Sequence, residues 1–160
     1  MIPDPKNPVV RLERTIAAPP HKVYRAWLEP DLLRRWLAPG GLEVARLEID
    51  ERVGGRFLVW HAEAGTDVGG FECELLELVP DRRIVFRWGF VGPARGDGPK
   101  YDSLLTVTLR EAPGGGTTLT LVHERLGELR AAMPRVADQV MRGWEMVLDK
   151  LPGVVGRVTR

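Results

Sequence analysis

The sequence predicts an α+β domain in which a curved antiparallel sheet of about six to seven strands wraps around one long carboxy-terminal helix. Three observations predict this fold class. Short segments of alternating apolar and polar residues recur along the chain. Most are joined by brief glycine- and proline-rich turns, which favour antiparallel neighbours because parallel strands would need crossover helices. Finally, residues 134–151 repeat apolar side chains at three- and four-residue spacing, as an amphipathic helix does.

The amino-terminal part combines one strand with two short helices. Three prolines among residues 1–8 predict an extended arm. The alternating stretch 9–16 is the first expected strand. The proline pair 19–20 suits the first turn of a helix, and Pro30 is expected to end it. A second short helix should then start with Asp31 as its N-cap and stop at the following "PGG".

The middle of the chain reads as a meander of strands. Residues 64–70, "AGTDVGG", are expected to form a turn, and residues 91–102 a long loop. We expect a single domain over 9–152 and a tail over 153–160. The strands predicted after the short helices are 42–49, 56–62, 71–79, 83–90, 103–112 and 117–126.

Composition narrows the class of protein. The chain has 160 residues, of which 44% are apolar and 28% charged, with a net charge of +1, as in a soluble single domain large enough to enclose a cavity. Opposite charges are interleaved, so no basic stripe predicts nucleic acid as a partner. No apolar run reaches the roughly 18 residues of a membrane span. The lone Cys73 excludes an internal disulfide and suits a reducing, cytoplasmic location. We expect a monomer or homodimer.

Several spaced motifs resemble one known family. They are "RTIAAPPHKVYRAWLEPDLLRRWLAP", "VGGRF", "LELVPDRRIVFRW" and the closing "GWEMVLDKL". In this order they resemble the activator of heat-shock-protein-90 ATPase-like group of the START/Bet v 1-like (SRPBCC) superfamily, over about residues 9–151. The resemblance implies a helix-grip fold with a largely apolar cavity between the sheet and the last helix. It implies no shared set of catalytic residues.

Three functions follow as hypotheses from the resemblance and the residues together. The first is binding of a small hydrophobic molecule in the cavity, as a carrier, sensor or stress-associated protein. The second is a chaperone accessory that contacts another protein. The third is a cyclase-type or hydrolytic enzyme with a histidine as general base. We expect no cofactor and no metal, since no HxH or HExxH cluster supplies zinc ligands.

The candidate binding residues lie on the inward faces of the expected strands and of the last helix. The apolar candidates are Phe57, Val59, Phe71, Ile84, Phe86, Trp88, Val107, Leu121, Val140, Trp144 and Leu148. Aromatic stripes of this kind fill a core or line a pocket. No catalytic residue is assigned.

Three polar residues share those inward faces. His61 follows Phe57 and Val59, and His123 follows Leu121, at period two. Each is interpreted either as a buried, hydrogen-bonded histidine or as a polar anchor for a ligand. Arg14 lies on the apolar face of the first strand, where it either extends to solvent or orients an acidic ligand group.

Overall fold

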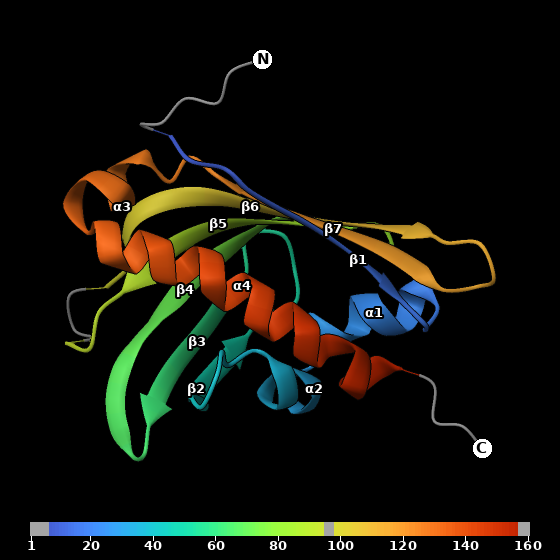
Figure 1. Ribbon diagram of the computed structural model, residues 1–160, viewed down its shortest axis with the longest axis horizontal. Coiled ribbons are helices and arrows are strands. Elements are labelled where there is room, and N and C mark those ends of the chain that lie inside the picture. Colours follow the sequence, from blue (N-terminus) through green and yellow to red (C-terminus); the bar gives the residue numbers. More distant parts are fainter. Residues whose placement is uncertain (1–6, 95–97, 157–160) are drawn as a thin grey trace.

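A computed structural model describes residues 7–94 and 98–156 and confirms the α+β helix-grip fold. Its seven strands form one antiparallel sheet in the order β1-β7-β6-β5-β4-β3-β2. The longest helix, α4, crosses the concave face of the curved sheet (Figure 1). The strands are β1 (Val10–Ile16), β2 (Glu43–Ile49), β3 (Arg56–Glu63), β4 (Thr66–Val79), β5 (Arg83–Val91), β6 (Lys100–Glu111) and β7 (Thr117–Glu124).

Four helices accompany the sheet: α1 (Pro20–Ala26), α2 (Pro30–Trp36), α3 (Gly127–Ala132) and α4 (Pro134–Val155). The prediction for Asp31 as a cap is wrong, because Pro30 is the first residue of α2 and Glu29 precedes it as the N-cap. Proline suits that position because its missing N–H would be unpaired there anyway. The short helix α3 was not expected, and α4 ends at Val155, one turn beyond 134–151.

The predicted turn over 64–70 is also wrong. Only Ala64 and Gly65 turn the chain, with φ angles of 50° and 82°, and β4 already starts at Thr66. Gly69 and Gly70 lie inside this strand because the neighbouring backbone comes very close. A Cβ atom on Gly70 would lie 2.3 Å from the carbonyl oxygen of Val59, and one on Gly69 would lie 2.7 Å from that of Val91.

Parts of three expected segments lie outside the described residues. These are residues 1–6 of the arm, 95–97 of the long loop and 157–160 of the tail. Within the described ranges, β6 starts at Lys100, so the loop after β5 is shorter than expected. No helix among these residues has the length and apolar character needed to cross a membrane.

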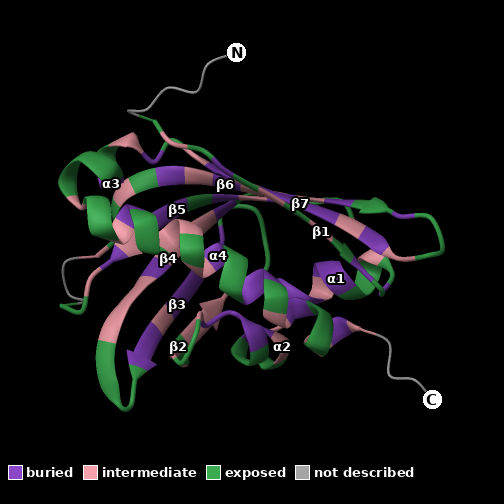
Figure 2. Ribbon diagram, in the orientation of Figure 1, coloured by how far each residue is buried: buried purple, intermediate pink, exposed green. Residues whose placement is uncertain are grey.

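Aromatic side chains fill the concave face on the side of α1 and α2. Trp27 lies fully buried against Trp36, with ring centroids 4.7 Å apart in an edge-to-face arrangement. The same ring is 6.1 Å from Phe86 on β5 and 6.1 Å from Trp144 on α4. Trp36 donates its indole N–H to the carbonyl oxygen of Ala26 at 3.0 Å, which ties the two short helices together. Figure 2 shows the sheet-facing side of α4 buried and its outer side exposed.

Replacing Gly70 by alanine is predicted to destabilise the protein by several kcal/mol, because the new Cβ overlaps the carbonyl group of Val59 on the adjacent strand. The matched control is Gly41→Ala, where no atom lies within 4 Å of the new methyl group and φ is not positive. That variant should change the free energy of unfolding by less than about 0.5 kcal/mol. Urea unfolding measures both, and equal effects would contradict the close strand approach at Gly70.

Candidate ligand-binding pocket

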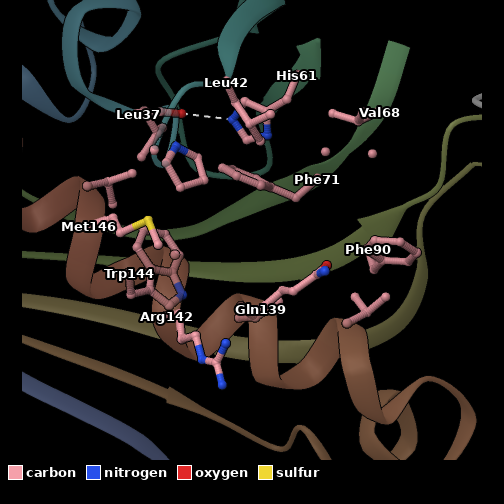
Figure 3. A pocket seen from close by; sticks show the side chains of 18 of the residues that line it. Leu37, Leu42, His61, Val68, Phe71, Phe90, Gln139, Arg142, Trp144 and Met146 are labelled. Atoms are coloured by element: carbon pink, nitrogen blue, oxygen red, sulfur yellow. Dashed lines mark hydrogen bonds between the residues drawn. The ribbon is translucent and has the colours of Figure 1, made fainter. Parts of the chain in front are cut away.

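A pocket of about 690 Å³ lies between the amino-terminal half of α4 and the sheet. Its size falls within the range of roughly 300–1,000 Å³ that is usual for small-molecule sites. It opens beside the segment that follows α2, and Figure 3 shows side chains from both sides reaching toward the space. Its lining comes from five regions: Leu37 and Pro39–Leu42 after α2, His61 and Glu63 on β3, Val68–Phe71 on β4, Trp88, Phe90 and Pro93 on and after β5, and Met133 with one face of α4.

Three buried aromatic rings, those of Phe71, Trp88 and Trp144, form part of the pocket wall. Phe71 stacks near Trp88, with centroids 5.4 Å apart and planes 28° apart, and its ring lies 6.3 Å from that of Trp144. Each of these three side chains is less than one-tenth exposed. The indole N–H of Trp88 is buried and has no hydrogen-bond partner among the described residues. Trp88 therefore contributes ring surface to the pocket rather than a hydrogen bond.

Three glycines line the pocket: Gly69 and Gly70 on β4 and Gly143 on α4. The first two are required by the close approach of the neighbouring strands. A methyl group at Gly143 would lie 3.7 Å from Cγ of Pro39, an ordinary van der Waals distance. Gly143 therefore faces the segment after α2.

Lys150 holds the rim of the pocket in place. Its ammonium group, on α4, donates hydrogen bonds to the carbonyl oxygens of Ala38 and Gly40, the second at 3.0 Å. Met146, one helical turn earlier, is 45% exposed at the same rim and lies beside Gly40. These contacts place an apolar side chain at the opening and fasten the segment after α2 to the helix.

His61 is buried in the pocket wall. Its Nε2 atom lies 2.9 Å from the carbonyl oxygen of Leu37, and its ring meets that of Phe71 edge-on. A carbonyl oxygen can only accept, so Nε2 of His61 carries the proton and donates. The histidine thus links β3 to the end of α2, as Figure 3 shows.

His123 lies fully buried behind the pocket and has both ring nitrogens engaged. The indole N–H of Trp144 lies 2.9 Å from Nδ1, and Nε2 lies 2.8 Å from the hydroxyl of Ser103. An indole N–H can only donate, so Nδ1 accepts and the neutral ring carries its proton on Nε2. Ser103 in turn donates to the carbonyl oxygen of Trp88 at 3.1 Å. Burial lowers the pKa of His123 to about 3, from an ordinary value of 6.5.

Five of the fourteen predicted binding residues line the pocket: His61, Phe71, Trp88, Val140 and Trp144. Eight others are almost completely buried in the core and do not line it: Phe57, Val59, Ile84, Phe86, Val107, Leu121, His123 and Leu148. They face the concave side as expected, but the short helices and the second half of α4 pack directly on them.

Arg14 is not part of the pocket. Its Nε atom lies 3.4 Å from Oδ1 of Asp149 on α4, and it also donates to the carbonyl oxygen of Glu13. The ion pair with Asp149 connects β1 to α4 and is partly exposed. Cys73 is buried, and burial raises the pKa of its thiol well above its ordinary value, which fits a small apolar filler.

One polar residue of the pocket lining, Gln139, was not predicted from the sequence. Gln139 lies on the same face of α4 as Val136, Val140 and Gly143, at helical spacing. Gln139 is exposed, and Figure 3 shows its carboxamide extending from the helix toward the side of the pocket where Phe90 lies. A polar residue within an otherwise apolar helical stripe is the signal that could have identified it.

Charged side chains stay at the opening. Glu63 and Arg142 are exposed members of the lining, and the guanidinium group of Arg142 points away from the aromatic walls in Figure 3. No group of three or more His, Cys, Asp or Glu side chains suited to a metal ion occurs among residues 7–94 and 98–156. The arrangement offers a mainly apolar surface, with aromatic rings in its wall and with charged groups and the amide of Gln139 at its mouth.

The family follows from a comparison with family models. The model described as "Activator of Hsp90 ATPase homolog 1-like protein" matches residues 17–156. The chain belongs to this family. None of the curated proteins compared matches the chain.

Solved structures of similar proteins agree with this family's fold. A protein from Chromobacterium violaceum is 32% identical, with 94% of this chain and 99% of that chain covered and a TM-score of 0.77. A protein from Mesorhizobium loti is 27% identical, with 96% and 100% covered and a TM-score of 0.73. One from Rhodobacter sphaeroides shares the fold at 21% identity, with 99% and 98% covered and a TM-score of 0.76.

The stability of this family member is predicted to fall as the pH drops from about 6.5 toward 3. In that range unfolded His123 binds a proton whereas folded His123 does not, so the unfolded state gains protons and is favoured by up to about 1.4 kcal/mol per pH unit. His123→Gln removes this titration. The stability difference between wild type and variant, from urea unfolding at pH 7, 6, 5 and 4, should narrow with falling pH. A constant difference would contradict a buried neutral imidazole.

Proposed function

We propose that the protein binds a small, uncharged, aromatic molecule in the pocket beneath α4 and acts as a cytoplasmic carrier or sensor. The observation that carries this proposal is the combination of buried aromatic rings in the pocket wall with an uncharged polar side chain, Gln139, at the pocket mouth. Phe71, Trp88 and Trp144 supply ring surface, and Gln139 supplies a donor and an acceptor. Sites of this composition suit apolar ligands that carry one polar group.

The charge distribution supports an uncharged ligand. Glu63 and Arg142 stand at the exposed opening, so a charge deep in the pocket would lose its water without gaining a partner. Both buried histidines nearby are already paired, His61 with Leu37 and His123 with Trp144 and Ser103. The buried indole N–H of Trp88 has no partner among the described residues, and it can donate a hydrogen bond but cannot compensate a charge. Binding energy would therefore come from burial of apolar ligand surface, with a modest contribution from Gln139.

The histidines support binding rather than base catalysis. His123 would have to give up its hydrogen bond from Trp144 before Nδ1 could accept a proton from a substrate. It also lies completely buried behind the wall. A chaperone accessory, as the family description suggests, would instead change the ATPase rate of a partner, and an ATPase assay with and without ligand separates the two functions.

Filling the pocket should abolish binding. N-phenyl-1-naphthylamine, an uncharged probe that fluoresces in apolar sites, should bind the wild-type protein saturably. Gly143→Leu places a bulky side chain against Pro39 inside the pocket, and should weaken probe binding at least tenfold. Gly153→Leu is the matched control, because Gly153 lies in the same helix with no atom within 4 Å of a new Cβ. Equal binding by both variants, or no saturable binding by the wild type, would refute the proposal.

Gln139 should determine the preference for a polar group. In competition with the same probe, 2-naphthol should bind about three- to tenfold more tightly than the isosteric 2-methylnaphthalene, the value of one net hydrogen bond. Gln139→Leu should bring this ratio close to one. Arg142→Gln, at the rim with its charge directed outward, should leave it unchanged. An unaltered ratio in Gln139→Leu would remove Gln139 from the site while leaving the pocket proposal intact.

A further inference from the structure

The convex face of the sheet, on the side away from α4 (Figure 1), carries apolar residues that do not belong to the hydrophobic core. Val85 on β5, Leu104 on β6 and Val122 on β7 are half-buried, but none is part of the core cluster or packs against it. Side chains alternate between the two faces of a strand. Thr106 lies between two of them, since it is paired with Val85 on one side and with Val122 on the other. These four residues form the convex patch.

Two rows of paired residues cross this patch from strand to strand, and each row carries opposite charges on opposite sides of β6. In the first row, Glu77 on β4 and Arg11 on β1 lie at the two ends. In the second row, Arg87 on β5 and Glu124 on β7 lie on either side of Leu104. The order of the charges is therefore reversed between the two rows.

Two of these four charges are paired within the chain and two are not. Glu77 and Arg87 each form an ion pair with a neighbour on the same face. Arg11 and Glu124 form no ion pair with any residue that the structure describes. One free cation and one free anion thus lie on the β1 and β7 side of the patch.

We propose that two copies of this chain associate through their convex patches, about a two-fold axis nearly parallel to β6. The strands follow the order β1-β7-β6-β5-β4, so this axis exchanges β7 with β5 and β1 with β4. Val85 of one copy then faces Val122 of the other, and Thr106 faces its own equivalent. Sheets that stack face to face keep their strand directions within about 30° of each other, which this axis allows.

The same axis places every charge of the two rows opposite a charge of the other sign. Arg11 faces Glu77 of the second copy, and Glu124 faces its Arg87. In a two-fold dimer each of these contacts occurs twice. Complementary charges of this kind fix the register of an association, because a shifted alignment would bring like charges together. This complementarity favours a second copy of the chain over an unrelated protein.

Two exposed apolar side chains at the margins of the patch fit the same arrangement. Leu76, which is 38% exposed, lies at the β-bulge of β4 next to Glu77. Val9, which is 53% exposed, directly precedes β1. Because the axis exchanges β4 and β1, Leu76 of one copy comes to the side of the other copy where Val9 lies.

The contact has limits along β6. Asp102 and Arg110, the outward residues of β6 beyond the patch and Thr108, are exposed, and each would face its own equivalent across the axis. Like charges therefore confine the contact to the strand between them. Five strands span about 19 Å at their usual spacing. A patch of this size predicts a weak, reversible dimer.

Sedimentation equilibrium of the full chain at rising concentration should show reversible dimerisation. Arg11→Glu and Glu77→Arg should each weaken it at least tenfold, because each change brings like charges together in both copies. An equimolar mixture of these two variants should dimerise as well as the wild type, because both contacts then join opposite charges. Arg34→Glu is the control, since it makes the same change in net charge on α2, away from the convex face.

A cysteine on the axis gives a measurement that does not depend on the charges. Mild oxidation of Thr106→Cys should join two copies through a disulfide, whereas Thr118→Cys, on the same face of β7 but off the axis, should give little dimer. The native Cys73 is buried and should not contribute. Equal yields from both variants, or a mixture of charge variants no more dimeric than either alone, would overturn the proposal. A wild-type chain that stays monomeric would also overturn it and leave this face to another protein.

Discussion

The hydrogen bond from the indole of Trp144 to His123 fixes where α4 crosses the sheet. Both partners are buried, and they join the middle of the long helix to β7 at 2.9 Å. An alternative position of the helix would leave a buried donor and a buried acceptor unpaired, at a cost of about 1–3 kcal/mol for each. Ser103 extends the connection to the backbone of Trp88 on β5, so three neighbouring strands share in it. The position of the helix then sets the depth of the space beneath it.

Trp144 also divides the concave face into a filled part and an open part. On one side, Trp27 lies 6.1 Å away and belongs to the packed aromatic cluster under the short helices. On the other side, the Trp144 ring forms a wall of the pocket with Phe71. A single side chain thus belongs to the core and to the candidate site. Changes at this position will affect stability and binding together, which is why Gly143 and Gln139, beside it, are better positions for separating the two properties.

The fold was predictable because the spacing of apolar residues indicates strands and helices from a single sequence. The extent of the pocket was not predictable in this way. Alternation correctly put Phe57, Ile84 and Leu121 on the concave side, but it does not say how closely the helix approaches at each point along that side. These three residues were predicted to line the pocket, but they are buried in the same hydrophobic core as Trp27 and Trp36. Gly69 and Gly70 were interpreted as turn residues from their local composition. They lie inside β4 instead, because the backbones of β3 and β5 come too close for a side chain. Contacts between strands distant in sequence leave no trace in local propensity.

The pocket beneath α4 combines a helix position without a side chain, Gly143, with a fully hydrogen-bonded histidine, His123, behind its wall. Gly143 lines the pocket on the helix side without adding a side chain to it. Both ring nitrogens of His123 are hydrogen-bonded, Nδ1 to Trp144 and Nε2 to Ser103. Its lowered pKa keeps the ring neutral at physiological pH. A general base needs a free lone pair near its substrate and a pKa close to the working pH. His123 has neither, so behind the pocket wall it positions the aromatic ring of Trp144.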